Sequence, residues 1–303
     1  MRLGSPAEYK LATPGWRGWL AATRPPTLSA AVTPVLVGSA LAYSGGEFAV
    51  LVFIATLAAA VLIQIGTNLA NDALDFEQGA DTPDRLGPVR ITASGQASAA
   101  EVKMASGVVF GLAALVGVFL VIEGGWPILA IGVVSIAAGL AYTGGPWPLG
   151  YHGLGDLFVF VFFGLVAVMG TYYLQAGSVT NLAFLASLPV GLTVAAILVV
   201  NNVRDIETDR RAGKLTLAVR LGERISRLQY VLMILAAFVL LPVLLVGGAG
   251  PAVGLALLAL PLAIVPCRSV LQGAQGAALN IVLKQTTLFH LVFGSLLAVG
   301  LLL

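Results

Sequence analysis

A cluster of carboxylate and amide side chains lies where one long apolar stretch ends. Asn68, Asn71, Asp72 and Asp75 stand at i, i+3, i+4 and i+7, so a helix would place all four on one face. These residues fall at the predicted C-terminal turns of the helix, where the dipole is negative and carboxylates are disfavoured. Such crowding predicts a bound cation that offsets the repulsion.

A second cluster repeats this pattern after a later apolar stretch. Asn202, Asp205 and Asp209 stand at i, i+3 and i+7, again on one helix face. Both clusters offer only carboxylate and amide oxygens, which suit Mg²⁺ better than a soft metal. The predicted metal ligands are Asn71, Asp72, Asp75, Asp81, Asn202, Asp205 and Asp209, with Asn68 and Asp156 as additional candidates. Asp72, Asp75, Asp205 and Asp209 are the predicted catalytic residues.

Other metal chemistries find few ligands in this chain. The sequence contains one cysteine, Cys267, and two histidines, His152 and His290, so a thiolate or imidazole cage is not expected. Basic side chains do lie close to the carboxylates in sequence. Mg²⁺ held by carboxylates and flanked by Arg and Lys is the arrangement expected for a bound diphosphate. The predicted diphosphate contacts are Arg85, Arg90, Lys214 and Tyr142.

The elements that must position these residues are membrane helices. Of 303 residues, 58% are hydrophobic and 10% are charged, too few polar side chains to cover a soluble protein. A membrane-spanning helix needs about 20 apolar residues. Nine candidate spans satisfy this requirement. They lie near 24–44, 48–71, 101–122, 127–143, 156–175, 181–203, 226–246, 251–271 and 283–303.

The distribution of basic residues predicts the orientation. All sixteen Lys and Arg residues lie in the N-terminal segment, in the connections after even-numbered spans, or at adjacent helix ends. The opposite connections, near 45–47, 123–126, 176–181 and 247–250, contain none. Positive loops stay in the cytoplasm, so the N-terminus and both acidic clusters are expected there and the C-terminus outside. We read no removable signal peptide in residues 1–22.

A single membrane domain, 1–303, is expected, because no long linker divides the chain. The two acidic clusters are each followed by a basic loop, four spans apart. This echo suggests four-helix repeats near 16–150 and 151–280 plus a ninth helix. The alternative is that two cytoplasmic loops merely share a polar composition.

The strings Asn71-Asp-Ala-Leu-Asp75 and Asp205-Ile-Glu-Thr-Asp209 resemble the two aspartate motifs of the UbiA superfamily of membrane prenyltransferases. With Arg85-Leu-Gly-Pro-Val-Arg90 and Tyr142-Thr-Gly-Gly-Pro, they resemble most the 1,4-dihydroxy-2-naphthoate polyprenyltransferases of menaquinone synthesis. Many members carry a third aspartate four residues after the one that matches Asp75. This chain has Gly79 there, and Asp81 is the candidate replacement.

The resemblance implies an all-α, UbiA-type bundle and a Mg²⁺-dependent transferase. It would move a polyprenyl group from polyprenyl diphosphate to 1,4-dihydroxy-2-naphthoate, with loss of CO₂, to give demethylmenaquinol. The implied location is the bacterial inner membrane, in contact with the lipid bilayer, with the active site facing the cytoplasm. No nucleic-acid partner is expected.

Two other functions remain open from the sequence. One is a UbiA-type prenyltransferase with another acceptor: 4-hydroxybenzoate, homogentisate, or a haem or chlorophyll precursor. The other is a divalent cation transporter that uses the acidic clusters as an ion path. The predicted position of both clusters at the membrane rim, rather than near mid-membrane, argues against a transporter.

Overall fold

The computed structural model of the chain describes residues 15–81, 86–88 and 90–303, and every regular element in these ranges is helical. Nine helical segments of this described part are long and apolar enough to cross a membrane, which confirms the predicted all-α membrane fold. They are Pro25–Ser44, Val50–Glu77, Ala99–Gly124, Trp126–Thr143, Gly155–Ala176, Asn181–Arg211, Glu223–Val246, Pro251–Leu271 and Ala277–Leu302.

Six of these spans are single α-helices. They are α3 (Val50–Glu77), α4 (Ala99–Gly124), α5 (Trp126–Thr143), α8 (Asn181–Arg211), α10 (Glu223–Val246) and α12 (Ala277–Leu302). Local sequence explains several of their ends. Ser98 and Glu101 form a capping box at the start of α4, and the Thr180 hydroxyl caps α8.

The other three spans change helix type along their length. The first joins the 3₁₀ turn η1 (Pro25–Leu28) to α2 (Ser29–Ser44). The fifth joins α6 (Gly155–Val159), the π-helical η3 (Phe160–Val166) and α7 (Ala167–Ala176), and the eighth joins the 3₁₀ segment η4 (Pro251–Ala259) to α11 (Leu260–Leu271). Three short helices lie outside the spans: α1 (Trp16–Ala22), η2 (Leu149–His152) and α9 (Leu217–Leu221).

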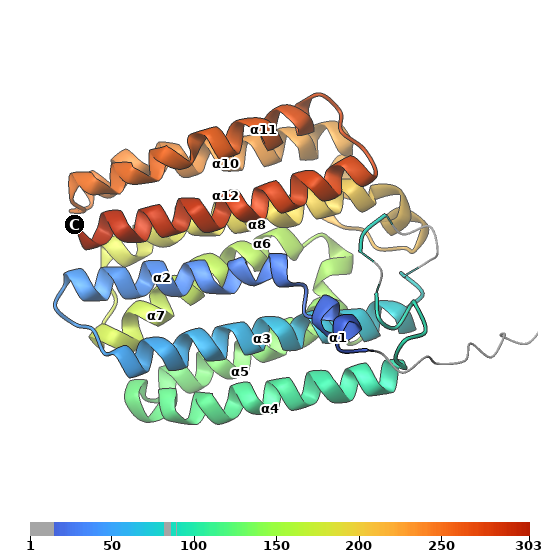
Figure 1. Cartoon of the computed structure of the whole chain (residues 1–303), viewed down its shortest axis with the longest axis horizontal. Helices are drawn as coiled ribbons and strands as arrows, with labels where there is room; N and C mark the ends of the chain where they lie inside the picture. Colours follow the sequence, from blue (N-terminus) through green and yellow to red (C-terminus); the bar gives the residue numbers. More distant parts are fainter. Residues whose placement is uncertain (1–14, 82–85, 89) are drawn as a thin grey trace, which may run out of the picture.

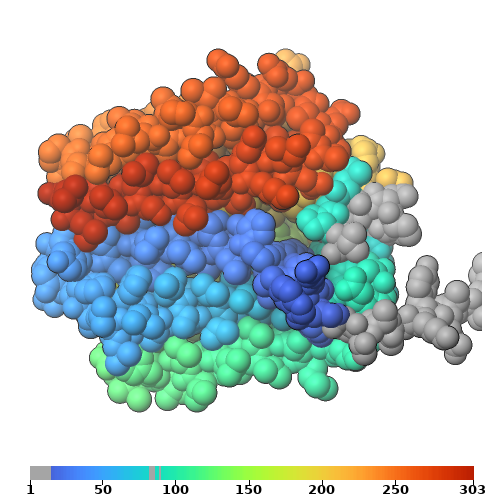
Figure 2. All heavy atoms as spheres, viewed as in Figure 1, coloured from blue at the N-terminus to red at the C-terminus, as the bar shows by residue number. Residues whose placement is uncertain are grey.

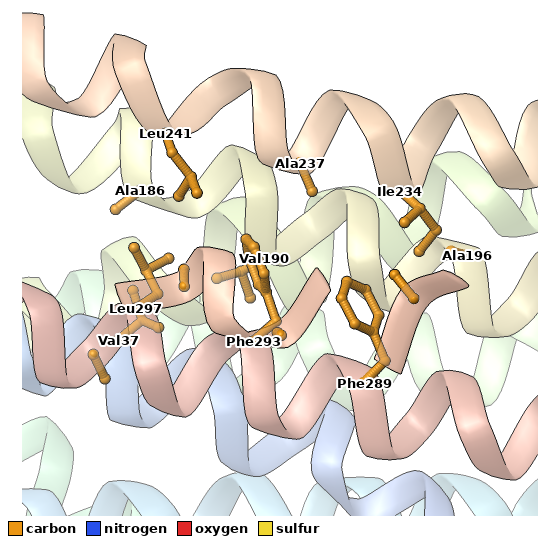
Figure 3. Close-up of a cluster of buried hydrophobic side chains, with 14 of the residues drawn as sticks. Val37, Ala186, Val190, Ala196, Ile234, Ala237, Leu241, Phe289, Phe293 and Leu297 are labelled. Atoms are coloured by element: carbon orange, nitrogen blue, oxygen red, sulfur yellow. The ribbon is translucent and has the colours of Figure 1, made fainter. Parts of the chain in front are cut away.

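The spans lie side by side, and α8 is the most buried of them (Figure 1). An apolar cluster joins α8 to α10, α12 and α2. In Figure 3, Phe293 of α12 lies beside Val190 of α8, Phe289 follows about a turn away along α12, and α10 contributes Ile234 and Leu241. This core fixes the position of α8, which carries the second acidic cluster.

Small residues allow close helix contacts elsewhere in the bundle. A Cβ added to Gly164 of η3 would lie 2.6 Å from the Cα of Gly191 in α8. Such backbone-to-backbone packing is typical of membrane helices, where van der Waals contact drives association. It holds the wide π-helical turn against the central helix.

The functional loops gather at one end of the bundle. We call this the polar end; it comprises the last turns of α3 and α8 with residues 90–98, 144–154 and 212–222. Helix α1 also lies here, whereas the C-terminus lies at the opposite end (Figure 1). In the space-filling view the described residues that precede α4 lie beside α1 at the polar end (Figure 2).

Candidate functional site

Asp75 is the residue on which most contacts of the polar end converge. Its Oδ2 lies 2.6 Å from Nη2 of Arg90, and its Oδ1 accepts a 2.9 Å hydrogen bond from the Tyr151 hydroxyl. Lys214 Nζ approaches the same Oδ1 at 3.5 Å. Asp75 is only 2% exposed. Cations from two loops therefore surround a buried carboxylate of the first cluster.

Asp72 binds the loop that carries Arg90. Its carboxylate accepts hydrogen bonds from the backbone N–H groups of Ile91, at 3.3 Å, and Thr92, at 3.2 Å. The Thr92 hydroxyl donates a further, short hydrogen bond to Asp72. Both carboxylate oxygens are thus engaged by the neighbouring loop. In this structure Asp72 fixes the position of Arg90.

Gly79 explains how Asp81 reaches the same group. It has φ +71°, a conformation that costs other residues about 1 kcal/mol. This left-handed turn ends α3, and the Ala80 N–H bonds back to the Asp75 carbonyl. The chain then reverses, and Asp81 Oδ2 lies 3.3 Å from Arg90 Nε. Gly79, which occupies the position of the third aspartate, therefore terminates α3.

The charges around Arg90 keep it protonated. Burial lowers the pKa of the Arg90 guanidinium, but the charges of Asp75, Asp81 and Asp72 more than offset this and raise the pKa overall. Removing one partner of such a buried pair costs about 3–5 kcal/mol. Arg90 is therefore a fixed positive charge at the polar end.

Tyr151 was not among the predicted site residues. It lies in η2, between α5 and α6, and its ring stacks under Lys214 Nζ at 5.0 Å from the ring centre. The backbone N–H of Leu215 donates to the Tyr151 carbonyl at 3.0 Å. Tyr151 therefore links the first acidic cluster, through Asp75, to the loop that follows the second. Burial and the negative charges of Asp75, Asp81 and Asp209 raise the pKa of its phenol, which stays protonated as a donor.

The second cluster has its own buried cation. Arg204 Nε and Nη2 donate to the two carboxylate oxygens of Asp205 at 2.8 and 2.6 Å. Arg204 also donates to Asn201, at 2.7 Å, and to Asn280 of α12, at 2.8 Å. Adjacent residues on a helix do not normally face each other. The Arg204–Asp205 ion pair could therefore not be predicted from the spacing of these residues in the sequence.

Asn280 connects the two halves of the polar end. Its Nδ2 donates to the carbonyl of Leu86, at 2.8 Å, while its Oδ1 accepts from Arg204. Helix α12, the ninth span, thereby contacts both the loop after α3 and the second cluster.

The remaining predicted residues lie around this centre. Asn71 accepts a 2.7 Å hydrogen bond from Thr143 of α5, and Asn68 donates to the Thr23 carbonyl at 2.9 Å. Asn202 is buried on α8, and Asp209 lies two turns from it, near the end of the same helix. Arg85 lies outside the described residues.

Tyr142 lies in the last turn of α5, below the polar end. A Cβ added to Gly150 or Gly155 would lie within 2.9 Å of its ring or hydroxyl, so the loop and the start of α6 close tightly over it. Asp156, the neighbour of Gly155, is 6% exposed and accepts a 3.4 Å hydrogen bond from Gln229 of α10. Neither residue contacts Arg90 or Lys214 through a hydrogen bond in the described structure.

An apolar cavity of about 550 Å³ begins at Tyr142 and runs between the helices. Its walls come from α2, α3, α4, α5 and the fifth span. Most of the lining is aliphatic or aromatic, and the polar exceptions are few. They are Thr56, Gln64, Thr67, Ser135, Tyr142 and Thr171. A polar end above an apolar cavity suits an amphipathic ligand with a charged head and a hydrocarbon tail.

The donor set of the polar end fits a hard divalent cation. The clusters supply carboxylate oxygens from Asp75, Asp205 and Asp209 together with amide oxygens. Within residues 15–81, 86–88 and 90–303, no three His, Cys, Asp or Glu side chains come close enough to form a cage of their own. Mg²⁺ commonly uses one or two carboxylates and completes its shell with water and substrate phosphate.

The fold and site together define an integral membrane protein with an acidic and basic centre at one end of a helical bundle. A family model described as the UbiA prenyltransferase family matches residues 31–300. The chain therefore belongs to the UbiA prenyltransferase family.

Several curated relatives match nearly the whole chain. A 1,4-dihydroxy-2-naphthoate octaprenyltransferase of Escherichia coli (strain K12) is 38% identical over 95% of this chain and 96% of its own length. A protein of the same name from Mycobacterium tuberculosis is 40% identical over 91% of this chain and 93% of its own.

Solved structures share the fold. An apo UbiA homolog from Aeropyrum pernix K1 superposes with a TM-score of 0.72 at 18% identity, over 90% of this chain and 97% of that one. A UbiA homolog from Archaeoglobus fulgidus bound to DMAPP and Mg²⁺ gives 0.62 at 13% identity, over 93% and 99%.

Proposed function

We propose that this chain transfers a polyprenyl group from polyprenyl diphosphate to 1,4-dihydroxy-2-naphthoate, with loss of CO₂, to give demethylmenaquinol. The observation that carries the proposal is the convergence of Arg90, Lys214 and Tyr151 on Asp75, directly above an apolar cavity. The shared name of the two relatives supports the naphthoate as acceptor.

The polar end would bind the diphosphate. Arg90 and Lys214 supply fixed positive charge, and Arg85 remains a predicted third contact. Asp75, Asp81, Asp205 and Asp209, with the amides of Asn71 and Asn202, would hold Mg²⁺, which neutralises charge on the departing diphosphate. The DMAPP and Mg²⁺ of the Archaeoglobus homolog, an allylic diphosphate with this cation, support that choice.

The cavity would take the prenyl tail. Each buried methylene contributes about 0.8 kcal/mol, so an aliphatic lining favours a long hydrocarbon. Tyr142, at the top of the cavity, would lie beside the allylic carbon. Exclusion of water from this position protects an allylic cation from hydrolysis.

In the proposed reaction the ring loses CO₂ rather than a proton. The allylic C–O bond breaks, and the diphosphate leaves with the electron pair. The carboxyl-bearing ring carbon then bonds to the allylic carbon. The carboxylate departs as CO₂, and its bonding electrons restore the aromatic ring.

The polar end would then face the cytoplasm from a bacterial inner membrane, where the soluble diphosphate head arrives. The basic loops support this orientation. Identification of the product distinguishes the naphthoate acceptor from the alternatives, 4-hydroxybenzoate among them. A cation transporter is disfavoured because the clusters lie at the end of the bundle, not at its middle.

Two matched variants on one helix test this site. Asp75→Asn should lower prenyl transfer at least 100-fold, because it removes the charge on which the polar end converges. Glu77 lies two residues after Asp75 and forms an exposed ion pair with Lys103. Glu77→Gln removes this pair and should leave the rate within twofold. Transfer should also stop in excess chelator and return with Mg²⁺. Near-normal turnover by Asp75→Asn would contradict the assignment.

A further inference from the structure

Gln64 is a buried amide inside the apolar cavity. It lies in the middle of α3, lines the cavity and is 9% exposed. Within the described part of the chain, no hydrogen bond of its side chain is found, and its amide atoms are not fully enclosed by protein, so they reach the cavity. Buried polar groups in native proteins almost always have a partner. An amide aimed into a cavity without one therefore points to a partner in a ligand.

Its depth follows from the register of α3 against α5. Asn71 accepts a hydrogen bond from Thr143, and a Cβ on Gly139 would lie 2.5 Å from the Thr67 hydroxyl. The two helices are therefore parallel and in register over this turn. Another turn down each helix reaches Gln64 and Ser135. Seven residues of helix rise separate Gln64 from Asn71, roughly 10 Å. Gln64 thus lies about two helical turns below the predicted diphosphate site.

Aromatic side chains line the same part of the cavity. Gly155 packs on the Tyr142 hydroxyl, and Phe158 and Phe162 follow at one and two turns along the fifth span. Their rings stack with centres 5.6 Å apart. Such walls suit a flat aromatic ligand. A prenyl tail carries no group that Gln64 could bond, whereas a hydroxylated aromatic acceptor does.

We propose that Gln64 is a specificity-determining residue that hydrogen-bonds a ring hydroxyl of the aromatic acceptor; this rests on the proposed function. The reacting ring carbon must meet the allylic carbon near the polar end. The hydroxyl farther from that carbon, at ring position 4, then points down toward Gln64. The amide can both accept from a hydroxyl and donate to it. A site built this way rejects an analogue that lacks the hydroxyl, because its own polar group stays unpaired.

The test compares two acceptors with three purified full-length proteins. The acceptors are 1,4-dihydroxy-2-naphthoate and 1-hydroxy-2-naphthoate, which lacks the 4-hydroxyl. The proteins are wild type, Gln64→Met and Ile54→Met, an exposed apolar position on the same helix that lies outside the cavity lining. Wild type and Ile54→Met should show about a tenfold higher KM for the analogue. In Gln64→Met this difference should fall below about twofold, because KM for the full acceptor rises. KM for the polyprenyl diphosphate should stay within about twofold in all three. Gln64→Leu serves the same comparison if the methionine variant does not fold.

Persistent discrimination against the analogue in Gln64→Met would overturn the inference. An equal rise in KM for both the acceptor and the diphosphate would also overturn it, since that indicates a general change in the cavity. Wild-type transfer to 4-hydroxybenzoate in place of either naphthoate would instead contradict the proposed function. The role of Gln64 would then be judged on that acceptor: a selective rise in its KM in Gln64→Met supports it, and an unchanged KM refutes it.

Discussion

At the scale of single residues, the polar end depends on how Asp75 shares its two oxygens. Arg90 engages one oxygen, while Tyr151 and Lys214 approach the other. Asp72 acts indirectly, because its carboxylate binds the backbone N–H groups of the two residues that follow Arg90. A buried carboxylate with several partners has a fixed orientation, which a metal and diphosphate site requires.

Tyr151→Phe tests that orientation. The change removes the hydrogen bond to Asp75 but keeps the ring beneath Lys214. A hydrogen bond to a charged group contributes about 1.5–3 kcal/mol, so KM for polyprenyl diphosphate should rise at least tenfold. Steady-state kinetics at saturating acceptor measures this. Tyr43→Phe, an exposed position at the opposite end of the bundle, is the control. An unchanged KM in Tyr151→Phe would show that the hydrogen bond has no part in binding.

The acidic motifs could be read from spacing, but their partners could not. Arg90 and Lys214 were predicted because they follow the clusters in loops on the same side. Arg204 was missed because neighbouring residues on a helix rarely pair, and here its long side chain folds back to Asp205. Tyr151 was missed because its glycine- and proline-rich surroundings indicate a turn and say nothing of what the turn contacts.

At the scale of helices, α3 contributes both chemistries of the site. Its last two turns carry Asp72 and Asp75, while its middle carries Gln64 and other cavity residues. Helix α4 faces the same cavity with Gly117, where an added Cβ meets open space. The absence of a side chain at this position leaves cavity volume to the ligand.

Gly117→Leu should therefore shorten the prenyl chain that the enzyme accepts. The leucine would fill part of the cavity, so kcat/KM for an octaprenyl diphosphate should fall at least tenfold relative to that for a geranyl diphosphate. Gly111→Leu, on the same helix, is also unhindered but lies outside the cavity lining. It should keep the wild-type ratio, measured by competition between the two diphosphates. Equal ratios in all three proteins would place the tail elsewhere.

Helix number was readable from the sequence because apolar length is a strong signal. Changes of helix type were not, since hydropathy does not report the hydrogen-bond pattern. The π-helical turn of η3 and the 3₁₀ segment η4 both lie inside evenly apolar runs. The cavity was equally hidden, because its lining comes from residues far apart in the chain. The predicted four-helix repeats remain a proposal.

At the scale of the whole molecule, the bundle separates charge from hydrocarbon. The acidic clusters and their cations gather at one end, and the C-terminus lies at the other (Figure 1). The charge distribution predicts that the polar end faces the cytoplasm. This orientation would let a water-soluble head group enter while its tail stays in lipid.

Cysteine labelling in intact cells checks the orientation. Replacing Cys267 by serine gives a background into which Arg210→Cys, at the polar end, or Ser178→Cys, at the opposite end, is introduced; both positions are exposed. A membrane-impermeant maleimide should label only the cysteine at 178, and should reach 210 after permeabilisation. The reverse pattern would refute the predicted topology.

Mass spectrometry of the products shows which acceptor is prenylated and whether its carboxyl group is lost. Purified protein is given Mg²⁺, octaprenyl diphosphate and an equimolar mixture of 1,4-dihydroxy-2-naphthoate, labelled with ¹³C in its carboxyl group, and 4-hydroxybenzoate. We expect one prenylated product, the unlabelled demethylmenaquinol, with release of ¹³CO₂ and loss of both signals in Asp75→Asn. A product that retains the label, or prenylation of 4-hydroxybenzoate alone, would contradict the proposed function.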